Sequence, residues 1–84
     1  MHVHVRLFAS LRDRLPAPDR GRADLDLAEG ATLADLIAQL EIPDKLAQMV
    51  LIDGRQAPRQ KGERAVRTLR EGETVSIFPP VSGG

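Results

Sequence analysis

Hydrophobic and polar residues alternate in three stretches of the chain, with the period of two that is typical of a half-buried β-strand. The three stretches are residues 3–7, 23–27 and 74–77. A fourth stretch, residues 49–52, is short and continuously apolar, and the turn dipeptide Asp53-Gly54 follows it. The pattern therefore predicts four strands.

The segment between residues 32 and 43 has the pattern of an amphipathic helix. Thr32 and Asp35 have the spacing of a capping box at its start, and Pro43 is expected to end it. Apolar side chains repeat at the helical spacing and form one stripe, made by Leu33, Leu36, Ile37 and Leu40. We expect this stripe to pack in the hydrophobic core.

The segments between these elements are predicted from their turn residues and polarity. Short helical turns are expected at residues 10–15 and 45–48, and two prolines and a glycine indicate a loop at 16–21. Residues 55–64 are polar and are predicted as loop, whereas 65–69 fit a short edge strand. Pairs of strands on either side of one helix predict an α+β fold, with the helix across one face of the sheet.

Length and composition restrict the class of protein. With 84 residues, the chain is expected to form one domain with a modest core, which leaves little room for a deep active site. It has no cysteine, which excludes disulfides, thiolate metal sites and a cysteine nucleophile. There is no apolar stretch of the roughly 20 residues that span a bilayer and no signal-peptide pattern, so we expect a cytoplasmic protein without membrane partners.

The charges balance overall but are segregated along the chain. Twelve basic residues offset twelve acidic ones. Residues 24–53 carry seven acids and one base, whereas residues 55–70 carry six bases and one acid. The two segments are interpreted either as solvated faces or as a polarised docking surface. A nucleic-acid-binding module is disfavoured, because the net charge is zero and Phe8 and Phe78 are the only aromatic residues.

The two histidines are a weak candidate metal site. His2 and His4 project from one face of the first predicted strand. Two ligands without nearby partners do not make a strong site, and exposed strand histidines are commoner. We therefore predict no metal.

The C-terminal segment carries the strongest candidate chemistry. We divide the chain into a domain at residues 1–78 and an extended tail at residues 79–84. The prolines are expected to end the last strand and project the tail, and the terminal glycines can pass a channel that any Cβ would block. Ser82 has no evident base beside it, so it is not expected to act as a nucleophile. The candidate site residues are Phe78, Pro79, Pro80, Val81, Ser82, Gly83 and Gly84.

A free carboxylate on Gly84 would be suited to activation by another enzyme. Such a carboxylate can attack the α-phosphate of ATP to form an acyl adenylate. A sulfur nucleophile can then convert the adenylate to a thiocarboxylate. The chain would need no catalytic residue of its own for these steps. It would need reach, a thin tip and a docking face, and Phe78 is expected to face the partner because it adjoins the tail.

Three stretches of the sequence resemble the small subunit of molybdopterin synthase, in the MoaD/ThiS sulfur-carrier family. The residues at 78–84, Phe-Pro-Pro-Val-Ser-Gly-Gly, resemble its C-terminal signature. Residues 5–13 resemble its first strand and following turn, and residues 69–78 resemble the approach to the tail. Ile52-Asp53-Gly54 stands where relatives often have Val-Asn-Gly, and the basic segment 55–70 matches nothing distinctive.

The resemblance implies a ubiquitin-like β-grasp fold, a mixed sheet with the first and last strands side by side at its centre. It implies adenylation of Gly84 by an E1-like enzyme that uses ATP and magnesium, with no cofactor bound permanently to the carrier. Sulfur would come from a persulfide, for example that of a cysteine desulfurase. The thiocarboxylate would then enter the synthase large subunit, in a heterotetramer with two copies of each subunit, and give sulfur to a cyclic pterin precursor of the molybdenum cofactor.

Two alternatives share the activated carboxylate. One is a sulfur carrier for thiamine or tungsten-cofactor synthesis, although thiamine carriers tend to be shorter and to lack the Phe-Pro-Pro run. The other is a ubiquitin-like protein modifier that joins Gly84 to lysines of its targets. Because adenylation is common to both, the tail alone does not separate a carrier from a modifier.

Overall fold

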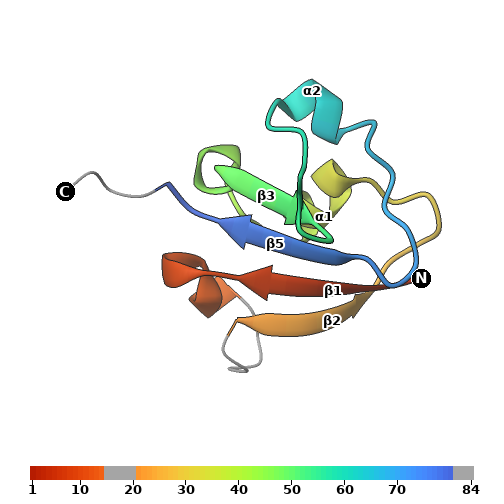
Figure 1. The fold of residues 1–84 in the computed structure, drawn as a ribbon, viewed down its shortest axis with the longest axis horizontal. Coiled ribbons are helices and arrows are strands. Elements are labelled where there is room, and N and C mark those ends of the chain that lie inside the picture. The colour runs from red at the N-terminus through yellow and green to blue at the C-terminus, as the bar shows by residue number, and fades with distance from the viewer. Residues whose placement is uncertain (15–20, 81–84) are drawn as a thin grey trace.

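The computed structural model describes residues 1–14 and 21–80 of the 84-residue chain. Within that part, five strands form one sheet and two short α-helices and two 3₁₀ turns connect them (Figure 1). The elements along the chain are β1 (His2–Leu7), η1 (Ala9–Arg14), β2 (Arg22–Asp26), α1 (Leu33–Gln39), η2 (Asp44–Leu46), β3 (Met49–Ile52), β4 (Arg55–Gln56), α2 (Lys61–Arg64) and β5 (Thr74–Phe78).

The sheet is mixed, and the first and last strands lie at its centre. The strand order is β2-β1-β5-β3-β4. β1 and β5 run parallel, and the pairs β1–β2, β3–β5 and β3–β4 are antiparallel (Figure 1). The four predicted strands are confirmed, and so is the central pairing that the family resemblance implied.

The helix α1 forms as its sequence predicts. The Thr32 hydroxyl accepts a hydrogen bond from the Asp35 amide at 3.2 Å, and the Asp35 carboxylate accepts one from the Thr32 amide at 2.9 Å. These two bonds complete the predicted capping box, which satisfies amides that the first turn would otherwise leave free. The helix ends at Gln39, before Pro43, and its stripe of leucine and isoleucine side chains is buried.

One face of the sheet packs against α1 and the other is open. Along β1, the side chains of Val3, Val5 and Leu7 are buried, whereas those of His2, His4 and Arg6 are exposed. Strand β5 alternates in the same way and buries Val75 and Ile77. The sheet therefore has one apolar face under the helix and one face available to a partner.

The segment after β3 differs from the prediction. The stretch expected to be loop contains β4 and α2, and no strand forms over residues 65–69. Instead, residues 67–69 run beside the start of α1: the Leu69 amide donates to the Ala31 carbonyl and the Leu33 amide donates to the Arg67 carbonyl, both at 2.9 Å. The sequence does not predict β4 and α2 because elements of two and four residues are too short to show a periodic pattern.

Arg64, one of the six bases in the 55–70 segment, is a core residue rather than part of a docking face. It is only 2% exposed, and its guanidinium donates to the carbonyls of Pro58 at 2.8 Å and Ala47 at 2.7 Å. Burial lowers the pKa of this guanidinium; the charge of Asp44 opposes the change, and that of Arg59 adds to it. Arg64 thereby ties α2 to the segment before β3 and the segment after β4.

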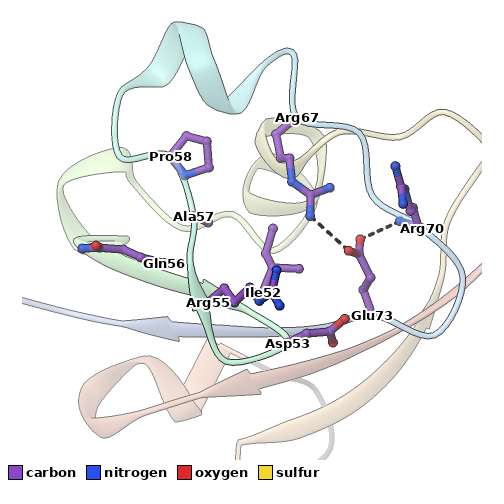
Figure 2. Close-up of a pocket in the computed structure, with 9 residues that line it drawn as sticks. All are labelled: Ile52, Asp53, Arg55, Gln56, Ala57, Pro58, Arg67, Arg70 and Glu73. Carbon is purple, nitrogen blue, oxygen red and sulfur yellow. Dashed lines mark hydrogen bonds and ion pairs between the residues drawn. The ribbon is translucent and has the colours of Figure 1, made fainter.

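Arg67 is also engaged within the fold (Figure 2). Its guanidinium reaches the Glu73 carboxylate at 3.0 Å, and the same carboxylate accepts a hydrogen bond from the Arg70 amide at 2.7 Å. Asp53 accepts a hydrogen bond from the Thr74 amide at 2.8 Å. These contacts surround an open pocket of about 530 Å³ and connect the turn after β3 to the start of β5. The basic segment is therefore partly structural.

Candidate functional site

The base of the C-terminal tail is held from both sides. β5 ends at Phe78 and is followed by Pro79 and Pro80 (Figure 1). From the β1 side, the Phe8 amide donates to the Ile77 carbonyl at 3.2 Å. From the β3 side, the Gln48 amide donates to the Phe78 carbonyl at 3.1 Å. Because prolines have no N–H to donate, sheet pairing of β5 stops here, and the tail begins from a fixed point.

The two aromatic rings of the chain stack at this point. The centroids of Phe8 and Phe78 are 4.2 Å apart and their planes differ by 9°. The Arg6 guanidinium carbon lies 5.4 Å from the Phe8 centroid, within the range of a cation–π contact. Both rings are half-buried. Phe78 is thus available on the open face, but its predicted role in partner binding stays a prediction.

A mainly apolar groove lies beside the base of the tail. It encloses about 700 Å³, and the exposed side chain of Met49 contributes to it at 43% exposure. We call it the tail-base groove; its residues are Phe8, Ala9, Ser10, Gln48, Met49, Phe78, Pro79 and Pro80. An open apolar surface on a protein of this size is typical of a binding site.

Sequence reasoning identified only part of this groove. Phe78 and the two prolines are predicted site residues, whereas Phe8 is not among them. Met49 and Gln48 were not singled out. The available signal is the continuous apolar run of β3. Because neighbouring side chains of a strand point to opposite faces, every second apolar side chain of this run points away from the helix. Met49 lies opposite Phe78 in the strand register.

The remaining predicted site residues, Val81, Ser82, Gly83 and Gly84, lie outside the described residues. The chemistry assigned to the Gly84 carboxylate therefore stays a prediction. The division at residue 78 also stays a prediction, although β5 ends there.

The two histidines contact separate carboxylates. His4 Nδ1 lies 2.6 Å from Asp24 Oδ1, and His2 Nδ1 lies 3.5 Å from Glu71 Oε2. In residues 1–14 and 21–80, no three side chains of the metal-binding types gather in one place. In the same ranges, no helix has the length and apolar character to cross a bilayer.

This sheet order and helix define a ubiquitin-like β-grasp protein, in which the C-terminal segment continues from a central strand. The chain belongs to the ThiS family, which matches residues 5–84. The family assignment confirms the resemblance to sulfur carriers that the sequence indicated.

Three comparisons show the range of similar proteins. The chain is 32% identical to small archaeal modifier protein 3 of Haloferax volcanii over 96 aligned positions, with 100% of both chains covered. The crystal structure of SAMP1 from Haloferax volcanii has a TM-score of 0.69 at 21% identity, with 100% of both chains covered. Coverage is also 100% for a chain of the complex of subunits 1 and 2 of molybdopterin-converting factor from Helicobacter pylori, with a TM-score of 0.62 at 20% identity.

Proposed function

We propose that this chain is a sulfur carrier whose working group is the Gly84 carboxylate. The observation that supports the proposal most directly is the base of the tail. A central strand, hydrogen-bonded on both sides, ends at two prolines beside an apolar groove, and Val-Ser-Gly-Gly follows in the sequence. This arrangement suits a carrier that docks its body on an enzyme while its terminus enters the enzyme's active site.

The proposed chemistry has three steps, all in partner active sites. A Gly84 carboxylate oxygen attacks the α-phosphorus of ATP in an E1-like enzyme, pyrophosphate leaves, and magnesium neutralises charge on the phosphates. A persulfide sulfur, supplied by an enzyme such as a cysteine desulfurase, then attacks the acyl carbon and AMP leaves. Reductive cleavage of the resulting acyl disulfide by a second thiol of the partner frees the thiocarboxylate. The carrier supplies position rather than acid–base groups.

We place the acceptor step in molybdenum-cofactor synthesis. In this proposal the chain is the small subunit of molybdopterin synthase, and its thiocarboxylate gives sulfur to a cyclic pterin precursor in the large subunit. The Phe-Pro-Pro-Val-Ser-Gly-Gly sequence supports this choice. The fold likeness to a chain of the Helicobacter pylori two-subunit complex is compatible with it. Phe78→Ala is expected to weaken binding to the large subunit; a titration with unchanged affinity would refute that role.

A second candidate function is protein modification, in which Gly84 is joined to lysines of target proteins. The similarity to small archaeal modifier protein 3 over the full length of both chains favours it. Carriers for thiamine or tungsten-cofactor synthesis would use the same activation step. These functions differ from the first in the acceptor of the activated carboxyl group.

The decisive experiment measures ATP-dependent alkylation at the C-terminus. The protein is incubated with ATP, magnesium, a sulfide source and its candidate E1-like enzyme, and is then alkylated and analysed by peptide mass spectrometry. With no cysteine in the chain, alkylation mapped to Gly84 reports a thiocarboxylate with little background. Intact mass alone is insufficient, because oxidation of Met1 or Met49 resembles an exchange of oxygen for sulfur in nominal mass.

Matched controls separate the outcomes. Omission of ATP and deletion of Gly84 are each expected to abolish the alkylation. Formation of the adenylate without alkylation, together with isopeptide-linked peptides from cells, would favour the modifier. If no cognate activating enzyme produces either the adenylate or the alkylated protein, both proposals are overturned.

A further inference from the structure

Three arginine side chains line one open pocket beside the tail-base groove. Arg6 comes from β1, Arg12 from η1 and Arg22 from β2, and all three are exposed. The pocket encloses about 410 Å³, and Leu7 and Phe8 complete its lining. In Figure 1 the end of β1, the start of β2 and the end of β5 meet at the left side of the sheet. We call this site the arginine pocket.

The strand register places two of these positive charges opposite each other. Arg6 is the direct partner of Arg22 in the antiparallel pair of β1 and β2. Two residues earlier on the same strand, His4 is opposite Asp24, and the two side chains contact each other at 2.6 Å. Like charges directly opposite each other destabilise a strand pair. Stability of the sheet therefore gives no reason for an arginine at both positions.

Among the residues whose side chains the structure describes, 1–12 and 21–80, no carboxylate lines the arginine pocket. The pocket in Figure 2 is a useful contrast, because it also has three arginines in its lining but contains Asp53 and Glu73. There Glu73 binds Arg67, so part of the positive charge is neutralised within the protein. The described lining of the arginine pocket contains no such carboxylate. Arg6 and Arg22 also line an adjoining pocket with Asp24, but Asp24 contacts His4. An external anion can therefore supply a counter-charge to the three arginines.

The local backbone holds Arg12 close to the strands. Gly21 has φ +75°, and its carbonyl accepts a hydrogen bond from the Leu7 amide at 2.6 Å. A Cβ on Gly21 would lie 2.9 Å from Cγ of Arg12 and 2.2 Å from the Leu7 carbonyl oxygen. The aliphatic part of the Arg12 side chain therefore packs directly against the backbone of Gly21, which has no side chain. Together with the position of Arg6 near the Phe8 ring, this packing gives the pocket a defined shape.

We infer that the arginine pocket binds carboxylates of an acidic segment on the protein partner that covers the tail-base groove. Phe8 lines both sites, so a partner seated on the apolar groove meets the arginines at its edge. An apolar centre with charged groups at the rim is the usual anatomy of a protein interface. Guanidinium groups bind carboxylates through paired hydrogen bonds, which adds orientation to attraction. The inference rests on the proposed function only for the identity of this partner.

A titration of the full-length chain tests the charge preference without any partner enzyme. The ¹⁵N-labelled protein is titrated at low salt with capped hexaglutamate, and the side-chain Nε–Hε signals of arginine are followed by NMR. Saturable shifts are expected at Arg6, Arg12 and Arg22. Arg22→Gln is expected to weaken the peptide about two- to fivefold, as loss of one exposed charge pair would do. Arg55→Gln is the matched control, since Arg55 is an exposed arginine on the opposite edge strand.

The outcomes distinguish binding from structure. Arg22→Gln is expected to leave the melting temperature unchanged or higher, because it relieves repulsion with Arg6; a lower value would indicate a structural role and count against the inference. Equal shifts at Arg55 and Arg70, or equal affinity in the Arg22→Gln and Arg55→Gln variants, would overturn it. Saturation of the pocket by inorganic phosphate but not by hexaglutamate would also overturn it, in favour of a phosphate-containing ligand.

The activating enzyme gives a second, separable measurement. If Gly84 is adenylated as proposed, Arg22→Gln is expected to raise the KM for the carrier while leaving kcat unchanged. Without any adenylation the proposed function fails, but the peptide titration still decides whether the pocket takes carboxylates.

Discussion

The ring of Phe8 lies against the ring of Phe78, with centroids 4.2 Å apart and planes within 9° of parallel. The two residues are at opposite ends of the sequence, immediately after β1 and at the end of β5. Their backbones are linked too, because the Phe8 amide donates to the carbonyl of Ile77. The stack therefore joins the two central strands at the base of the tail.

The Phe8–Phe78 stack is expected to contribute measurable pairwise stability. In a double-mutant cycle of Phe8→Ala and Phe78→Ala, followed by urea unfolding, we expect a coupling free energy of about 0.5–1.5 kcal/mol. The control cycle pairs Phe8→Ala with Val66→Ala, because Val66 is 78% exposed and outside the core. Additive effects of the two phenylalanine substitutions would show that the rings are adjacent without stabilising each other.

Gly21 is expected to be intolerant of alanine. Gly21→Ala places a Cβ 2.2 Å from the Leu7 carbonyl oxygen and also requires a left-handed backbone. We expect a loss of about 2–5 kcal/mol in unfolding free energy, the sum of backbone strain and overpacking. Gly54→Ala is the matched control: its φ is +82° and nothing lies within 4 Å of the added Cβ. That variant isolates the strain, of about 1–2 kcal/mol; equal losses at the two positions would contradict the predicted clash.

Arg64 is expected to be the most important basic residue of the 55–70 segment for stability. Arg64→Met keeps much of the buried stem but leaves the carbonyls of Pro58 and Ala47 without this donor. We expect a loss of about 2–4 kcal/mol in chemical unfolding. Arg59→Met, at an exposed position of the same segment, is expected to change stability by less than about 0.5 kcal/mol. Similar effects of the two substitutions would argue against the structural role of Arg64.

Removal of the last two glycines is expected to separate function from stability. The buried apolar residues of the described part all lie between Val3 and Ile77. Deletion of Gly83 and Gly84 should therefore change the unfolding free energy by less than about 0.5 kcal/mol. The same variant is expected to lose ATP-dependent alkylation completely. A large loss of stability would mean that the tail packs on the domain, and retained alkylation would place the reactive group elsewhere.

Several elements were predictable because their signals are local. The alternation in β1 and β5 reflects the pleat of a strand with one buried face, and the burial pattern of both strands follows it. Thr32 and Asp35 form the predicted capping box because both partners lie within one turn. The turn at Asp53-Gly54 has φ of 52° and 82°, the left-handed geometry that this dipeptide favours.

Other elements were not predictable, since nothing local distinguishes them. β4 and α2 are too short for a periodic signal, and their residues are mostly polar and exposed. Arg64 was assigned to a charged face because its sequence neighbours are charged. Its burial depends on carbonyl groups of Ala47 and Pro58, at positions 17 and 6 residues away.

The strands β1, β2, β3 and β5, the helix α1 and the composition of the C-terminal segment can be read from the sequence, because each depends on residues within a few positions of one another. The surroundings of the base of that segment depend instead on contacts between distant parts of the chain. The parallel pairing of β1 with β5 brings Phe8 to Phe78, and the register of β1 with β2 sets Arg6 opposite Arg22. Both relationships arise from hydrogen bonding and packing between distant segments, which no local pattern encodes.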